Sequence, residues 1–254
     1  MDRRADLVAL ARALGDPALD LVVLSEGNAA ARQGDATLLV TASGSALPTT
    51  QDDEIVEVSL APLLDFVRSP DQGTDMNAVK DLLVRACVRP GSPRPSIETL
   101  MHAVVLDRTD ATFIGHTHPT PLVGLLCAPE AGRRFERPLF PDEAVVCGAA
   151  YAYVPYASPG LPLARAVEGV LEAFEERHGE SPRAVLLENH GFMALGATPA
   201  EVRAVTTMAV KAARVRGVAA AAGGIETLSA DEVRSLVDRP DEKLRRSRLV
   251  AGES

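Results

Sequence analysis

The segment Ala111-Thr-Phe-Ile-Gly-His-Thr-His-Pro119 joins a short apolar stretch to two histidines at its end. The apolar part is typical of a buried strand, and positions i and i+2 of a strand point to the same face. We therefore expect His116 and His118 to project together from a strand end, with Thr117 facing the other way. Two imidazoles placed in this way suit one metal ion. Paired histidines also occur at protein surfaces without a metal.

A third histidine and a carboxylate occupy comparable positions. His190 follows the apolar strand predicted at 184–187. At this position it is either a metal ligand or a turn histidine that forms a hydrogen bond with the backbone. Glu98 lies in the first turn of a predicted helix, where the helix dipole favours a carboxylate. As a functional residue it would be a metal ligand or a general base. His102 lies one turn further along the same helical face. We interpret it as an orienting or core histidine, and a fifth metal ligand is the alternative.

The rest of the sequence alternates between strand and helix patterns, which favours one α/β domain over residues 1–228. A charged tail follows at 229–254, containing Arg245, Arg246 and Arg248, and either a solvated end or a subunit contact would explain it. Ser96 is expected to cap the helix that contains Glu98. Strands are predicted near 36–40, 54–60, 111–118, 151–155 and 184–187, and helices near 5–14, 75–88, 161–178 and 198–222.

Composition narrows the class of protein. The chain has 254 residues, 46% of them hydrophobic, and a formal net charge of −9. A chain of this length can bury a sizeable core. Its net negative charge argues against a nucleic-acid partner, because a protein binds phosphates through clustered basic residues. Three scattered cysteines do not form a disulfide framework, so we expect reduced thiols and a cytoplasmic location. No signal peptide or membrane-spanning run is predicted, so no membrane partner is expected.

Two segments rich in small and hydroxyl residues are candidate anion sites. They are Ser25-Glu-Gly-Asn28, which follows an apolar run, and Thr41-Ala-Ser-Gly44, which follows a strand. Small residues let backbone N–H groups approach a phosphate, and Ser96 at a helix N-terminus could add a hydroxyl. Each segment taken alone is equally consistent with a tight turn.

Taken in order, these segments resemble the class II aldolase/adducin family from about residue 20 to 215. The resemblance implies a single three-layer α/β/α domain with a central, largely antiparallel sheet. It also implies a homotetramer with active sites at subunit interfaces and a small-molecule substrate. The matching pieces are Gly27-Asn28, Thr41-Ala-Ser-Gly44, Pro95-Ser-Ile-Glu98 with His102, His116-Thr-His118-Pro119, Val154-Pro-Tyr-Ala157 and Leu187-Glu-Asn-His-Gly191.

By position, the resemblance implies one divalent metal per chain. Zinc is the first expectation, with manganese, cobalt and iron as alternatives. The implied metal ligands are His116, His118 and His190, joined by Glu98, which is also the implied acid/base. The implied substrate- or phosphate-binding residues are Asn28, Ser43, Gly44 and Ser96.

The chain departs from the family pattern at three places. Gly-Asn-x-Ser is replaced by Gly27-Asn-Ala-Ala30, and Ser-Ser-Glu by Ser96-Ile-Glu98, so two phosphate donors are missing. The aldolase branch takes a proton-donating tyrosine from the neighbouring subunit, and rough alignment places that position near Pro141. Asp142 and Glu143 stand there instead, and Asp142 is our candidate catalytic acid. Alternatively, the acidic pair only starts a helix after the proline.

The expected function is that of a metal-dependent aldolase, a carbon–carbon lyase. It would cleave a hydroxy-carbonyl compound, such as a sugar phosphate, through a metal-stabilised enediolate. Dehydratase, epimerase, decarboxylase or iron-dependent oxygenase activity at the same three-histidine site is the alternative, because imidazole suits several metals. A non-catalytic adducin-like binding module is a distant third, since a scaffold has no need for a convergent ligand set.

Overall fold

A computed structural model describes residues 2–73, 75–242 and 244 of the chain. Its centre is a seven-stranded sheet in the order β3-β2-β1-β4-β7-β6-β5. Neighbouring strands are antiparallel except for β5 and β6, which are parallel. The strands are β1 (Asn28–Gln33), β2 (Thr37–Thr41), β3 (Ile55–Ser59), β4 (Phe113–Thr117), β5 (Ala152–Val154), β6 (Ala184–Leu187) and β7 (Gly191–Gly196).

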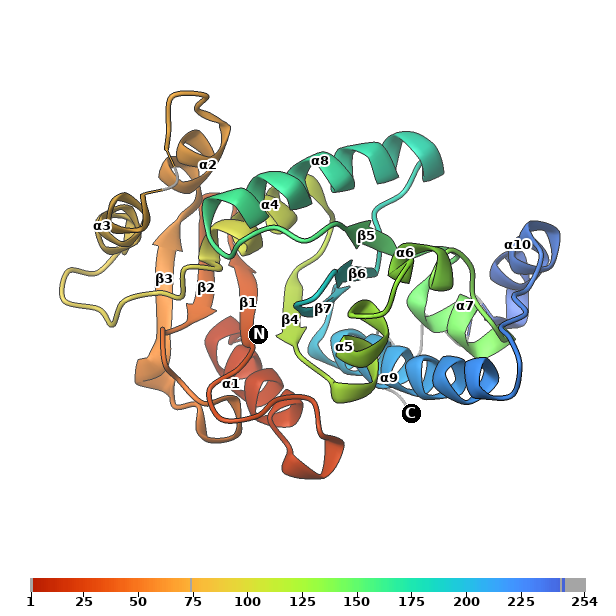
Figure 1. The fold of residues 1–254 in the computed structure, drawn as a ribbon. Helices are drawn as coiled ribbons and strands as arrows, with labels where there is room; N and C mark the ends of the chain where they lie inside the picture. Colours follow the sequence, from red (N-terminus) through yellow and green to blue (C-terminus); the bar gives the residue numbers. More distant parts are fainter. Residues whose placement is uncertain (1, 74, 243, 245–254) are drawn as a thin grey trace.

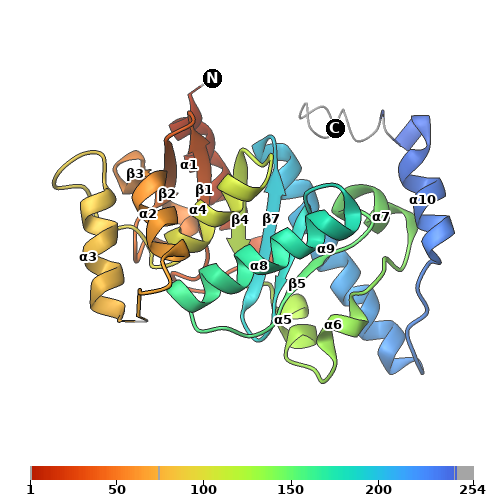
Figure 2. The ribbon, with the colours of Figure 1, turned by 90° about the horizontal axis from the view of Figure 1, so that it is seen from above.

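Helices cover both faces of this sheet (Figures 1 and 2). On β4, Phe113 packs into one apolar core and Ile114 into a second, separate core on the opposite face. One face carries α2 (Leu60–Arg68), α3 (Met76–Ala86), α4 (Thr99–Arg108) and α8 (Leu161–His178). The other carries α1 (Arg3–Leu14), α5 (Thr120–Leu126) and α9 (Pro199–Ala221). The predicted three-layer fold with a largely antiparallel sheet is confirmed.

Several elements were missed at the sequence level, and burial explains why. Strands β1 and β7 lack the alternation of apolar and polar residues by which a strand is recognised. Helices cover both faces of the sheet, so consecutive residues such as Ala29, Ala30 and Ala31 are all fully buried. The expected cap at Ser96 is wrong. Helix α4 begins at Thr99 with Glu98 at its N-cap, and the Ser96 hydroxyl accepts the Glu98 N–H in the preceding turn.

A close approach at Gly115 brings two helices onto β4. A Cβ atom at this position would lie 2.5 Å from Leu14 Cδ1 of α1 and 2.9 Å from Val202 Cγ1 of α9. The absence of a side chain on this face lets both helices pack against the strand. The following residue, His116, points to the opposite face, where α4 lies.

The C-terminal region adds α10 (Ala230–Asp238), which packs against α7 (Pro141–Cys147). This helix lies inside the tail predicted at 229–254, whereas Arg245, Arg246 and Arg248 lie outside the described residues.

All three cysteines are free, as expected for reduced thiols. None of the described helices combines the length and apolar character that crossing a membrane would require. In the part of the chain that the structure describes, the short helices are α6 (Ala131–Arg134) and three 3₁₀ helices at Pro17–Leu19, Leu47–Thr49 and Asp52–Glu54.

Candidate metal centre

Three histidines meet where β4 ends and β7 begins. His116 is the second-last residue of β4, His118 lies just beyond the strand, and His190 lies in the turn between β6 and β7. Strands β4 and β7 are antiparallel neighbours with Thr117 opposite Phe192, so the end of β4 lies beside the start of β7. The ligand atoms of the three histidines all lie within 4.8 Å of one another. The predicted convergence of the three imidazoles is therefore present in the structure.

Glu98 completes the cluster from the N-terminus of α4. Its Oε1 lies 3.1 Å from His190 Nε2, and its Oε2 lies 3.4 Å from His116 Nε2. His118 Nε2 in turn lies 3.0 Å from His116 Nε2. Only 12% of the Glu98 side chain is exposed. Three nitrogen atoms and a carboxylate thus face one another in a largely enclosed space.

This donor set fits a tetrahedral divalent metal. Ligand atoms about 2.0–2.1 Å from a zinc ion in a tetrahedron are about 3.3 Å from one another. Three of the separations in the cluster, 3.0, 3.1 and 3.4 Å, lie near that value, and the histidine ligand atoms are at most 4.8 Å apart. His116 Nδ1 donates to the Phe192 carbonyl at 3.1 Å, which leaves the Nε2 lone pair free to bind a cation. The Glu26 carboxylate lies 4.0 Å from His118 Nδ1, on the outer side of that ring.

The electrostatics of the cluster also favour a cation. Burial raises the pKa of Glu98, but His116 and His190 outweigh burial and hold that pKa well below its usual range. Burial lowers the pKa of His116, but Glu98 and the Phe192 carbonyl outweigh burial and raise it. Burial, together with His116 and His190, lowers the pKa of His118 to about 3. His118 therefore stays neutral at neutral pH, with a lone pair available for coordination.

The turn that carries His190 has backbone features suited to this position. Asn189 has a φ of +52°, a left-handed conformation that asparagine tolerates better than most residues. Gly191 has no side chain where a Cβ would lie 2.7 Å from His118 Cδ2 and 2.8 Å from the Thr117 carbonyl oxygen. The glycine therefore lets β7 pass close to His118, which explains the Asn-His-Gly sequence of the turn.

The candidate anion-binding segment Thr41-Ala-Ser-Gly44 lies beside the loop that carries Ser96 and leads to Glu98. Ala42 forms a bridge with Pro95, and the Ser43 N–H donates to the Arg94 carbonyl at 2.8 Å. Gly44 has a φ of +87°, which closes the turn. The structure thus brings Ser43, Gly44 and Ser96 together. It also adds the Arg94 guanidinium, which donates to Ser43 Oγ at 3.3 Å. Arg94 was missed because in the sequence it is only one cation in a proline-rich loop.

Asn28 and His102 lie behind Glu98. Asn28 Nδ2 donates to Glu98 Oε2 at 2.6 Å, and Asn28 Oδ1 contacts His102 Nε2. His102 is fully buried, and burial together with His116 lowers its pKa to about 3. Both polar atoms of Asn28, an expected phosphate ligand, are therefore used inside the protein.

The acidic pair at the start of α7 is placed differently. Asp142 lies in the first turn of α7, 3.9 Å from Lys211 Nζ of α9, and not among the histidines. Glu143 is fully buried and accepts hydrogen bonds from the Leu139 N–H and the Tyr151 hydroxyl, both at 2.8 Å. Both residues lie in the first turn of a helix that begins at a proline, and Glu143 is enclosed in the core.

Glu143 forms a buried ion pair with Arg216, and this pair predicts a large effect on stability. Arg216 Nη1 lies 2.6 Å from Glu143 Oε1, and both side chains are fully buried. We expect Arg216→Met to lower the free energy of unfolding by about 3–5 kcal/mol, because a buried carboxylate would lose its charge partner. Denaturant unfolding would measure this. Arg214→Met, at an exposed position of the same helix, is the control, and equal stability of both variants would contradict the expectation.

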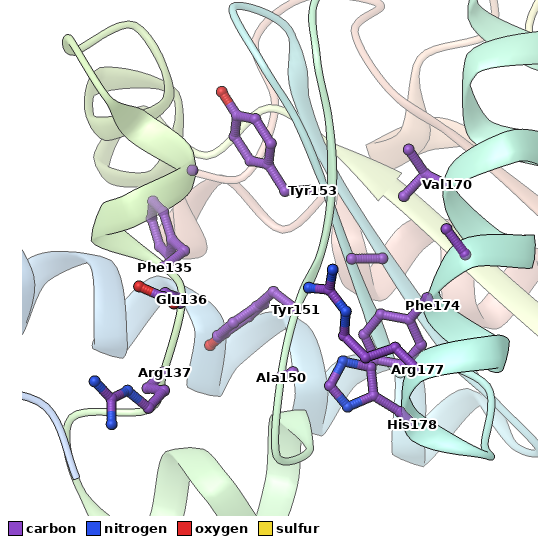
Figure 3. Close-up of a pocket in the computed structure, with 13 residues that line it drawn as sticks. Phe135, Glu136, Arg137, Ala150, Tyr151, Tyr153, Val170, Phe174, Arg177 and His178 are labelled. Atoms are coloured by element: carbon purple, nitrogen blue, oxygen red, sulfur yellow. The ribbon is translucent and has the colours of Figure 1, made fainter. Parts of the chain in front are cut away.

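A separate cavity of about 440 Å³ lies against the edge strand β5 (Figure 3). Phe174, Arg177 and His178 line it from α8, opposite Tyr151, whose hydroxyl reaches the buried Glu143. None of the candidate metal, catalytic or anion-binding residues lines it. The candidate site is therefore the histidine cluster and not this cavity.

Comparison with known proteins identifies related sequences. The sequence model of the Class II Aldolase and Adducin N-terminal domain matches residues 5–216. A protein of Bacillus subtilis (strain 168), named "Uncharacterized oxidoreductase YuxG", is 31% identical over 160 residues. That stretch is 63% of this chain but 20% of the Bacillus protein, so the chain spans about one fifth of the length of that relative.

Solved structures share the fold over most of their length. The N-terminal class II aldolase domain of a conserved Thermoplasma acidophilum protein is 25% identical, with a TM-score of 0.64 over 83% of this chain and 91% of its own. YgbL of Escherichia coli is 20% identical, with a TM-score of 0.68 and coverage of 92% and 97%. An L-fuculose 1-phosphate aldolase is 21% identical, with a TM-score of 0.68 and coverage of 96% and 97%.

Proposed function

The chain belongs to the class II aldolase and adducin family, and we propose that it is a divalent-metal-dependent aldolase acting on a hydroxy-carbonyl compound. The observation that carries this proposal is the convergence of three imidazoles and one carboxylate on one enclosed point. A protein that used the fold only as a binding module would have no need to bury such a donor set.

In this proposal His116, His118 and His190 hold the metal, and Glu98 joins them in the resting state. When bound, the ion supplies Lewis-acid polarisation of the substrate carbonyl. Zinc is the first expectation for this donor set, and manganese, cobalt and iron are alternatives. The Phe192 carbonyl keeps the His116 ring in the orientation that directs Nε2 inward.

Glu98 is the proposed acid/base. Its carboxylate oxygens lie beside the point where the three histidines converge, so it can take a proton from, or return one to, a substrate carbon held there. His116 and His190 hold its pKa well below the usual range, so at neutral pH it is ionised, which is the form that a general base requires. Retro-aldol cleavage and its reverse both need such a group next to the carbanionic carbon.

The anionic end of the substrate is proposed to lie at the Ser43, Gly44 and Ser96 segments. Arg94 supports this by adding a positive charge at Ser43, within reach of a phosphate or a carboxylate. Ala30 is fully buried in the core, so the hydroxyl missing at that position has no replacement there. We therefore propose an anionic hydroxy-carbonyl substrate, with sugar phosphates as one member of that class.

A homotetramer with interfacial sites is proposed on the family resemblance. Two exposed apolar residues support it, because Val23 and Leu24 are 55% and 87% exposed on the loop that precedes Glu26 and borders His118. A neighbouring subunit would cover them. In such an assembly Asp142, half-buried in the first turn of α7, would act as catalytic acid on a neighbour's site, and the segment at 229–254 would contact a neighbouring subunit.

Elemental analysis of protein purified without an affinity tag or chelator tests the proposal. We expect about one equivalent of zinc, manganese or cobalt per chain. Phosphorylated and unphosphorylated ketoses and hydroxy-keto acids would then be screened for aldehyde release. Iron as the dominant metal would favour an oxygenase instead. No metal, even after incubation with excess divalent ions, would overturn the proposal and favour a binding module.

A further inference from the structure

We propose that Asn28 and His102 are positioning residues that hold the Glu98 carboxylate in one orientation beside the histidine cluster. Asn28 contacts Glu98 and His102 contacts Asn28, so both would act through Glu98. The inference deepens the proposed function and rests on it wherever metal binding is the measured quantity.

Three elements bring this chain of contacts together. In the β1–β4 register Asn28 lies opposite His116, so its side chain starts next to the cluster. Helix α4 supplies both Glu98 and His102, whose backbone N–H donates to the Glu98 carbonyl one turn earlier at 3.1 Å. Asn28 lies between the two side chains and contacts both. The carboxylate is thus held from behind, while its oxygens face His116 and His190.

Chemistry determines the direction of each hydrogen bond. An ionised carboxylate only accepts, so the amide nitrogen of Asn28 must face Glu98. The amide oxygen of Asn28 then faces His102 and needs a donor, so His102 must carry its proton on Nε2. Its Nδ1, which is buried without a partner among the described residues, is then a bare acceptor. Turning the Asn28 amide around, or moving the His102 proton to Nδ1, would leave two acceptors or two donors in contact.

Burial separates this role from that of a substrate ligand. Asn28 is 5% exposed, and both of its polar atoms contact protein groups. His102 is fully buried beneath it. An amide in this setting is placed to restrict the rotation of Glu98 rather than to receive a phosphate from solvent. The side chains that support metal ligands commonly change metal affinity by 10–100-fold when removed.

The test compares two substitutions of one residue. His102→Gln keeps an N–H at the same distance along the side chain as Nε2, whereas His102→Asn places its N–H at the position of Nδ1. We expect the zinc dissociation constant, measured by competition with a chelator, to stay within about 3-fold of the natural chain in His102→Gln. It should rise about 10-fold or more in His102→Asn and in Asn28→Ala. The visible spectrum of the cobalt-substituted protein should change in the same two variants.

Val104→Ala is the matched control, because Val104 is fully buried on the same helix and is apolar. It should lower stability and leave the zinc affinity unchanged. Equal zinc affinity in all the variants, or equal losses in His102→Gln and His102→Asn, would overturn the inference. An equal loss in Val104→Ala would do the same, because it would show that general destabilisation is responsible.

A measurement on metal-free protein keeps the inference distinct from the proposed function. Nitrogen NMR of the histidine rings should show His102 protonated on Nε2 and bare on Nδ1, with that tautomer lost in Asn28→Ala. A proton on Nδ1 instead would overturn the inference even if the natural chain binds zinc. If the natural chain bound no metal, the proposed function would fail while the predicted tautomer could still be found.

Discussion

His116→Ala is expected to reduce the metal content from about one ion per chain to about zero, and to abolish any metal-dependent activity. His116 is the central member of the cluster, because its Nε2 lies 3.0 Å from His118 Nε2 and 3.4 Å from Glu98 Oε2. Its loss removes one of the three imidazoles and one of the two histidines that contact the Glu98 carboxylate. Elemental analysis after dialysis against metal-containing buffer, with circular dichroism to verify folding, measures the effect.

His178→Ala is the matched control for this experiment. His178 is exposed at the end of α8, where its ring stacks on Phe174, and it belongs to a different part of the molecule. This variant should retain the metal content of the natural chain. Full metal retention in a folded His116→Ala protein would refute the assignment of His116 as a ligand.

Glu98→Gln is expected to retain metal and to lose turnover by about 10²–10⁴-fold. Glutamine has nearly the same shape, and its amide oxygen can still accept from Asn28 Nδ2, where Glu98 Oε2 now does. It cannot accept the substrate proton, because an amide is not a base at neutral pH. The three histidines remain to hold the ion. Exchange of carbon-bound protons of a hydroxyketone with solvent deuterium, followed by NMR, reports this step directly.

Glu175→Gln supplies the control, because Glu175 is an exposed glutamate on α8. Its exchange rate and metal content should equal those of the natural chain. Proton exchange at the natural rate in metal-loaded Glu98→Gln would show that another group is the base. Loss of metal together with loss of exchange would show that Glu98 is needed as a ligand, and the acid/base assignment would then lack support.

The histidine cluster could be predicted largely from local sequence. His116 and His118 lie at positions i and i+2 at the end of an apolar strand, and side-chain alternation alone directs both to one side. The three-layer fold was expected from the alternation of elements together with the family resemblance. Local patterns failed where both faces of a strand are buried, as in β1, because its run Ala29–Ala31 shows no alternation of apolar and polar residues.

The second set of contacts could not be predicted from local sequence. Asn28 and His102 are 74 residues apart, and their contact depends on the pairing of β1 with β4 and on the packing of α4 above them. Asp142 and Glu143 are neighbours in sequence, yet one faces Lys211 at the surface and the other Arg216 in the core. The orientation of α7 about its axis decides which of the two side chains is buried, and the local sequence does not specify that orientation.

By itself, the sequence determined which residue types stand at strand ends and turns, since backbone periodicity and turn preferences act over a few residues. This was sufficient to select His116, His118, His190 and Glu98 as candidates. Only the tertiary structure decided which of them meet, which neighbours orient them, and that Asn28 faces Glu98. Those outcomes depend on strand register and helix packing, which arise from many weak contacts between segments far apart in the chain.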